Sequence, residues 1–168
     1  MRVACPDIQR VSPPGEGSHL KVAFKRSAAN DRTPVIDRLI DALTGGTGFC
    51  HSELLFANGE RLTALPKGGI QISRRAEGYA AGDWVILEIG RPEAEDWIRN
   101  WYRGEAGCHY DYLGLFKTVI PFWPCSGSRW WCSECVDAAL WIAGVHAERC
   151  WMASPNSQAA MLAAQEQK

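Results

Sequence analysis

The chain of 168 residues has the length of one domain built around a single core. Its net charge is −1, with 18 basic and 19 acidic residues spread along the chain, so no nucleic-acid surface is predicted. Hydrophobic residues make up 46 % of the chain, yet no apolar run approaches the roughly 18 residues that a membrane-spanning helix needs. No signal-peptide pattern is visible at the N-terminus, and we therefore expect a cytoplasmic protein.

The first half of the chain predicts a leader, a strand, a helix and a small antiparallel meander. Residues 1–19 are rich in Pro, Gly and Ser and form the expected leader, whereas residues 20–168 form one expected domain. The first helix is expected to begin at Pro34, with Thr33 as its N-cap. Asn58 and Gly59 predict a hairpin turn. The predicted strands are 20–24, 51–56, 60–64, 70–73 and 83–89, and the predicted helix is 35–43.

The second half is predominantly helical by pattern. Pro92 favours a helix start, and Ser154 is the expected N-cap of the last helix. Strands followed by helices predict an α+β fold, in which about four to six antiparallel strands pack against helices. The helix that starts at Cys132 is expected to lie on the sheet face that carries His51. The predicted helices are 92–102, 110–120, 132–144 and 155–164.

Cys132 follows a turn-prone run and stands at the start of a strongly helical segment. Helix N-termini carry unpaired N–H groups and the positive end of the helix dipole, which favour a thiolate. A buried cysteine that only fills the core fits the same position. Cys132 and Cys135 also form a CxxC, but no second CxxC or HxxxH exists, so we expect neither a metal nor a cofactor.

His51 and Glu53 are two residues apart in a predicted strand, so their side chains share one face. Burial of a carboxylate in an otherwise apolar strand costs free energy unless the carboxylate is paired. Glu53 could orient the imidazole and stabilise its cation, as the third member of a nucleophile, base and orienter set does. Two polar residues that face solvent on an edge strand would give the same pattern.

Four strings resemble the circularly permuted NlpC-like, papain-fold hydrolases, a group that includes the YiiX-like proteins. FCHSELLF at 49–56 is similar to the SHVELVF strand of that group, and YDYLGLF at 110–116 is similar to its YDYLGLL segment. WWCSECV at 130–136 resembles the start of the cysteine helix, and ASP at 153–155 resembles the segment that follows. The resemblance covers roughly residues 20–165 and is strongest to a branch often encoded in phages and prophages.

This resemblance implies a permuted papain-like fold and a bacterial, phage or prophage setting. It further implies Cys132 as nucleophile, His51 as general base and Glu53 as the polar third member. Gln71, on a neighbouring strand, is an alternative third member. Cys135 takes the place of an aliphatic residue and is expected in the core. Cys50 precedes the histidine, where an oxidised pair with Cys132 would silence the enzyme.

Further site residues are expected around the nucleophile. The backbone N–H of Cys132 is the first candidate to bind an oxyanion. The Tyr110 hydroxyl is the second, because related folds place a tyrosine upstream of the nucleophile; aromatic core packing is its alternative role. Glu134 is expected to point away from Cys132 and not to serve as a second base. Walls of a substrate groove, or core packing, are the expected roles of Trp123, Trp130 and Trp131.

These features together predict a cysteine hydrolase that cleaves an amide bond in a peptide or cell-wall-type substrate through an acyl-enzyme. A lipid or other acyl ester is the second substrate class, for hydrolysis or acyl transfer. A non-catalytic phage or prophage accessory module and a CxxC metal or redox protein are the competing classes. The sequence does not specify the oligomeric state.

Overall fold

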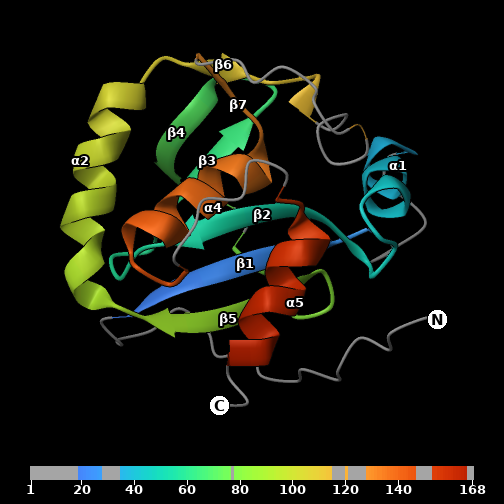
Figure 1. Ribbon diagram of the computed structural model, residues 1–168, viewed down its shortest axis with the longest axis horizontal. Coiled ribbons are helices and arrows are strands. Elements are labelled where there is room, and N and C mark those ends of the chain that lie inside the picture. The colour runs from blue at the N-terminus through green and yellow to red at the C-terminus, as the bar shows by residue number, and fades with distance from the viewer. Residues whose placement is uncertain are drawn as a thin grey trace.

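The computed structural model of the chain describes residues 19–27, 35–76, 78–114, 120, 128–146 and 153–165. They form an α+β fold with one five-stranded antiparallel sheet, a small second sheet and four α-helices within this described part (Figure 1). The large sheet contains β1 (Leu20–Arg26), β2 (Phe49–Leu55), β3 (Glu60–Leu65), β4 (Gly69–Arg74) and β5 (Trp84–Gly90). The helices are α1 (Val35–Leu43), α2 (Glu95–Glu105), α4 (Cys132–Ile142) and α5 (Pro155–Gln165), with a 3-10 turn, η1 (Pro92–Ala94), before α2.

The strand order of the large sheet is β4-β3-β2-β1-β5. The hairpin between β2 and β3 turns at Gly59, whose φ of 79° suits glycine, as the Asn-Gly signal predicts. The expected meander is confirmed for β2, β3 and β4, but wrong for β5, which crosses to the other edge and pairs with β1. β1 is therefore an interior strand, largely buried and paired with β2 on one side and with β5 on the other.

The hydrophobic core lies between the sheet and the helices. Helices α4 and α5 lie over one face of the sheet, and α2 runs along its flank (Figure 1). Val136 and Leu140 of α4 share one buried cluster with Phe24, Leu54 and Leu62 of the strands. α4 is buried on all sides from its first residue to Leu140, which explains its apolar sequence.

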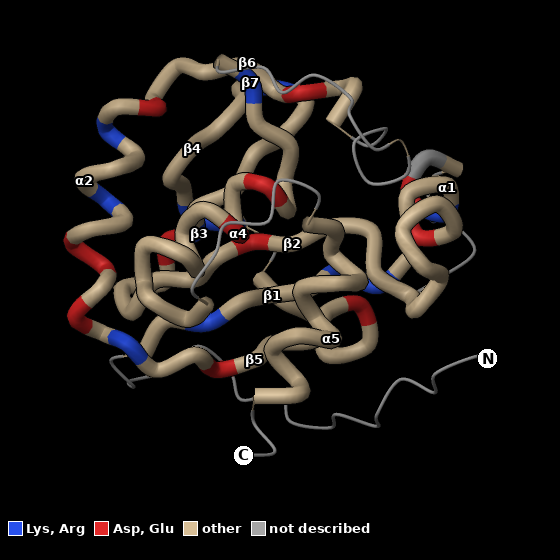
Figure 2. Tube along the Cα trace, viewed as in Figure 1, with Lys and Arg blue, Asp and Glu red and all other residues tan. Residues whose placement is uncertain are grey.

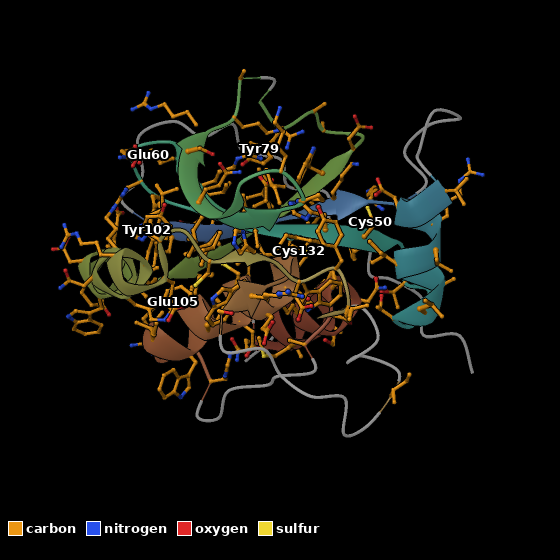
Figure 3. All side chains as sticks on the ribbon, turned by 90° about the horizontal axis from the view of Figure 1, so that it is seen from above. Cys50, Glu60, Tyr79, Tyr102, Glu105 and Cys132 are labelled. Carbon is orange, nitrogen blue, oxygen red and sulfur yellow. The ribbon has the colours of Figure 1, made fainter. Side chains whose placement is uncertain are left out.

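The expected placement of the Cys132 helix on the His51 face is wrong. Side chains alternate along β2, and Leu54 is the residue that packs in the α4 cluster, so His51 and Glu53 point to the opposite face. A smaller cluster of Ala23, Leu55 and Trp84 lies on that second face. Figure 3 shows Tyr79 there, on the side of the sheet away from α4.

Although α4 packs on the sheet face opposite to His51, two features bring Cys132 toward His51. β2 pairs with β1 along its length but with β3 only at Leu54 and Leu55, so β2 and β3 separate toward His51. The second sheet consists of β6 (His109–Tyr110) and β7 (Arg129–Trp130). Its strand β7 ends at Trp130, two residues before α4 begins at Cys132. That helix contacts both β2 and β3.

Most of the other predicted elements are confirmed. Exceptions concern the leader, of which residues 1–18 lie outside the described part, and the helix expected over 110–120. Tyr110 is in β6 instead, and residues 115–119 are not described. Thr33 and Pro34, the expected cap and start of the first helix, also lie outside the described residues. Only part of the predicted apolar stripe of α1 is buried: Ile40 is buried, while Val35 and Leu39 are exposed.

Acidic and basic positions are interspersed along α2 (Figure 2).

Candidate active site

Cys132 is the first residue of α4, as the sequence predicts. Trp131 precedes it as an extended N-cap, with φ −104° and ψ 167°, and makes no side-chain capping bond. The Trp131 carbonyl accepts from the N–H of Cys135 at 3.1 Å, which closes the first turn. The N–H of Cys132 has no partner within the helix, as is usual for the first residues of a helix.

His51 lies in β2 with its ring largely buried, at 16 % exposure of the side chain. Its Nε2 atom is 3.1 Å from Glu53 Oε1 and 3.2 Å from Thr63 Oγ1. The ring also meets the edge of Trp84, with centroids 6.3 Å apart. Glu53 and Thr63 thus both contact the Nε2 atom of the ring.

Glu53 is fully buried and is the centre of an ionic network. Arg61 Nη1 donates to Oε1, and Arg75 Nη1 lies 3.5 Å from the same oxygen. Tyr79 donates its hydroxyl hydrogen to Oε2 at 2.8 Å. Burial alone would raise the pKa of Glu53, but His51, Arg61 and Tyr79 outweigh burial and lower the pKa. Glu53 is therefore a fixed carboxylate, not a solvent-facing residue of an edge strand.

Cys132 and His51 interact directly. Burial would lower the pKa of His51, but the charge of Cys132 and its hydrogen bond, followed by Glu53, raise it to about 9. An imidazolium is therefore the form of His51 at neutral pH. A cation at this position stabilises a thiolate. The three residues that the sequence singled out thus lie in one chain of contacts.

Gln158 of α5 connects the two elements that carry these groups. Its Nε2 atom donates to the carbonyl of Ser133 at 2.6 Å, and Ser52 donates its hydroxyl hydrogen to Gln158 Oε1 at 3.0 Å. Ser52 and Ser133 are the immediate neighbours of His51 and Cys132. Gln158 is buried, so these bonds fix the spacing between β2 and α4.

Cys50, Tyr110 and Trp131 surround Cys132. Cys50, Trp131 and Cys132 are buried in one cluster against which Tyr110 packs. Both Cys50 and Cys132 are free thiols, so the oxidised pair stays a prediction. Burial, with the charge of Asp37, raises the pKa of Cys50 to about 12, which keeps it a protonated thiol. Burial and the charge of Cys132 raise the pKa of Tyr110, so its hydroxyl remains a neutral donor.

A cavity of about 380 Å³ adjoins this cluster. Its wall is mixed, with cations, carboxylates and apolar side chains. Cys132 itself is 1 % exposed and does not line the cavity; its neighbours do. Lys25 and Asp37, paired at 2.6 Å, form one side. The residues around the catalytic candidates that line it are Cys50, His51, Glu53, Arg61, Arg75, Tyr110 and Trp131.

Gln71, the alternative third member, stands opposite Thr63 in the β3–β4 ladder. Thr63 therefore occupies the place next to His51, and Gln71 is one strand farther away. The sequence analysis did not identify Thr63 as a neighbour of His51. The hairpin turn at Asn58 and Gly59 could have identified it, because a hairpin turn sets which residues of two strands lie opposite each other. Continuing the register of Leu54 with Leu62 places Thr63 beside Glu53. No local pattern indicates Arg75 or Tyr79, which reach Glu53 from the chain beyond β4.

Other predicted residues have mixed outcomes. Cys135 is buried in the core, as expected. Trp130 is also buried, and Trp123 lies outside the described residues. Glu134 is buried and has a polar or charged partner, so it is not a surface residue of the first turn. Within the described part of the chain, no three His, Cys, Asp or Glu side chains form a metal-binding group.

The chain matches no family model, no curated protein and no solved structure in the three comparisons made. Among the helices that the structure describes, none has the length and apolarity to cross a membrane.

Proposed function

We propose that this chain is a cysteine hydrolase with Cys132 as nucleophile, His51 as general base and acid, and Glu53 as orienting carboxylate. The interactions of His51 with Cys132 and with Glu53 carry the proposal. The permuted NlpC-like fold and the phage or prophage setting belong to the same proposal, because they rest on the motif resemblance. The antiparallel sheet with a cysteine helix packed on it is compatible with that fold.

In the proposed reaction, Cys132 acts as a thiolate and His51 as an imidazolium. The Cys132 thiolate adds to the substrate carbonyl carbon, and the C=O π electrons move to the oxygen as an oxyanion. The N–H of Cys132 at the helix start is the backbone donor to that oxygen, and Tyr110, which packs against the Cys132 cluster, is the side-chain donor that the sequence suggests. His51 gives its proton to the leaving amine as the C–N bond breaks, which leaves a thioester. Water, deprotonated by His51, then hydrolyses the thioester and regenerates the thiolate.

An amide of a peptide or cell-wall type is the first substrate class, because protonation of an amine leaving group requires an acid such as His51. An acyl ester is the second class, for hydrolysis or acyl transfer. Exposed apolar residues favour that class, since Val35 and Leu39 belong to α1, whose Asp37 and Ile40 line the cavity. Tyr112, also exposed, lines the cavity from another segment.

A binding or accessory module is the competing function, and the burial of Cys132 favours it. In such a protein Cys132 would only fill the core. The two functions differ in a measurable property, because a core thiol reacts slowly and a thiolate beside an imidazolium reacts fast.

Alkylation by iodoacetamide at pH 7, followed by mapping of the modified cysteines, tests the proposal. We expect Cys132 to react faster than Cys135, a matched control that is buried one turn farther along the same helix. His51→Gln should slow alkylation of Cys132 and leave that of Cys135 unchanged. Equal rates for Cys132 and Cys135 in the native protein would remove the nucleophile and favour the module.

A further inference from the structure

The indole N–H of Trp131 is a buried hydrogen-bond donor. Trp131 is 1 % exposed, and its Nε1 atom has no hydrogen-bond partner among the described residues. Burial of an unpaired donor costs roughly 1–3 kcal/mol, so such groups are rare in folded proteins. Because Trp131 lines the cavity, a molecule in the cavity could supply the missing acceptor.

The neighbouring tryptophan makes the contrast plain. Trp130 is also buried, but its Nε1 atom donates to Glu105 Oε2 at 3.0 Å. The two residues are adjacent in sequence and similar in burial, yet only Trp130 has its N–H satisfied. The orphan donor is therefore a property of position 131 and not of tryptophans in this region.

The ring of Trp131 is held in place. A Cβ atom on Gly114 would lie 2.9 Å from Cγ of Trp131 and 3.0 Å from its Cβ, so the backbone at Gly114 packs directly on the indole. Trp131 also belongs to the buried cluster with Cys50 and Cys132. A donor fixed in this way needs no reorganisation when it binds an anion, which is the property that an oxyanion site requires.

We propose that the indole N–H of Trp131, together with the backbone N–H of Cys132, binds the oxyanion that forms when Cys132 attacks a carbonyl. This inference rests on the proposed function, and it replaces the Tyr110 hydroxyl as the side-chain donor. The two donors belong to consecutive residues at the start of α4; the indole N–H has no acceptor among the described residues, and the N–H of Cys132 is one of the first in its helix, which have no partner within the helix. Trp131 keeps its proton throughout; it only donates the hydrogen bond while the thioester forms.

Two reagents separate this role from the nucleophile itself. p-Nitrophenyl acetate acylates Cys132 through a tetrahedral oxyanion and expels p-nitrophenolate, which is measured by its absorbance. Iodoacetamide alkylates the same sulfur by displacement of iodide, and no oxyanion forms at a carbonyl. Loss of an oxyanion donor should therefore slow acylation and leave alkylation unchanged.

Trp131→Phe should lower the rate constant for acylation by about 100-fold, the typical loss for one oxyanion donor. Replacement of Trp131 by benzothienylalanine, which keeps the shape of the ring but has no N–H, should give the same selective loss even if the Phe variant folds poorly. Trp130→Phe removes the satisfied N–H outside the cavity and is the matched control. It should change neither rate.

Three results would overturn the inference. Equal loss of acylation and alkylation in both Trp131 variants would mean that the ring only shapes the site. A larger selective loss in Tyr110→Phe than at position 131 would assign the donor to Tyr110. Fast alkylation of wild-type Cys132 without any acylation would mean that no oxyanion is bound. Slow alkylation of wild-type Cys132 is a different failure, because it removes the proposed nucleophile itself.

Discussion

Glu53 and Leu54 are neighbours in β2, and both are completely buried, but on opposite faces of the sheet. Leu54 packs among apolar side chains under α4. Glu53 is surrounded by His51, two arginines and a tyrosine on the other face. The sheet thus separates a face that supplies hydrophobic stability from a face that holds an ionic network. Equal burial has different consequences, because removal of the Glu53 charge leaves the largely buried Arg61 guanidinium without its carboxylate.

Glu53→Gln should have the largest effect on stability. It removes the carboxylate that the largely buried Arg61 contacts, and loss of one partner of a buried pair costs about 3–5 kcal/mol of unfolding free energy. Chemical denaturation at pH 7 measures this loss. Combination with Arg61→Met should recover part of it, because one uncompensated cation is removed. If Glu53→Gln leaves the unfolding free energy unchanged, the ionic network does not stabilise the fold.

The same variant has a defined dependence on pH. The pKa of Glu53 is lowered below the ordinary value of 4.5, so its contribution to stability is present above that pH and lost as pH falls through the folded pKa. The difference between wild type and Glu53→Gln should therefore shrink below about pH 4.5. A difference that stays constant in acid would show that the carboxylate charge is not its source.

Leu54→Ala is the matched change on the other face. It should cost about 2–5 kcal/mol of unfolding free energy through lost burial and a cavity under α4. The pKa of His51 and the alkylation rate of Cys132 should stay as in wild type, whereas Glu53→Gln changes both. An equal loss of Cys132 reactivity in the two variants would mean that the faces are coupled through the strand.

The sequence predicts much of this arrangement because its signals are local. Alternation placed His51 and Glu53 on one face, and helical pattern placed Cys132 at a helix start; both are confirmed. The face on which α4 packs was predicted wrongly. That choice depends on Leu54 and its neighbours forming a more apolar surface than the face of Glu53, a comparison between elements that one strand does not reveal.

The sequence also did not predict the partners of Glu53 and Ser52 that lie far from them in the chain. The cost of burying Glu53 predicted a partner, and His51 was the local choice. Arg61, Arg75 and Tyr79 are 8 to 26 residues away, and nothing in their own surroundings marks them as ligands of a carboxylate. Gln158 is 106 residues from Ser52, so its role depends on the docking of α5. Hydrophobic periodicity carries no information on such contacts.

The pH dependence of His51 tests whether the ionic face includes the nucleophile. NMR titration of the ring should give a pKa of about 9 instead of the ordinary 6.5. Cys132→Ser should lower the pKa more than Glu53→Gln does, because Cys132 makes the larger of the two favourable contributions. Turnover should fall above about pH 9, where His51 loses the proton that the leaving group needs.

The sign for stability follows from the same shift. The folded pKa of His51 is raised above its ordinary value, so its stabilising contribution is complete below pH 6.5 and lost as pH rises to about 9. The unfolding free energy of His51→Gln should therefore change less with pH than that of wild type between pH 6.5 and about 9. A His51 pKa near 6.5 in the folded protein would mean that neither Cys132 nor Glu53 stabilises the imidazolium.

Cys50→Ala should have the smallest effect, although Cys50 lies next to His51 in sequence and in the cluster with Cys132. Its thiol stays protonated, with a pKa of about 12, so it adds no charge beside Cys132 at neutral pH. The alkylation rate of Cys132 should change by less than about threefold, a difference of about 0.7 kcal/mol or less. The protonated state also makes Cys50 a slow partner in disulfide formation, since only a thiolate attacks. Rapid, Cys50-dependent loss of reactivity with diamide would contradict this and assign Cys50 to the ionic face as a redox partner of Cys132.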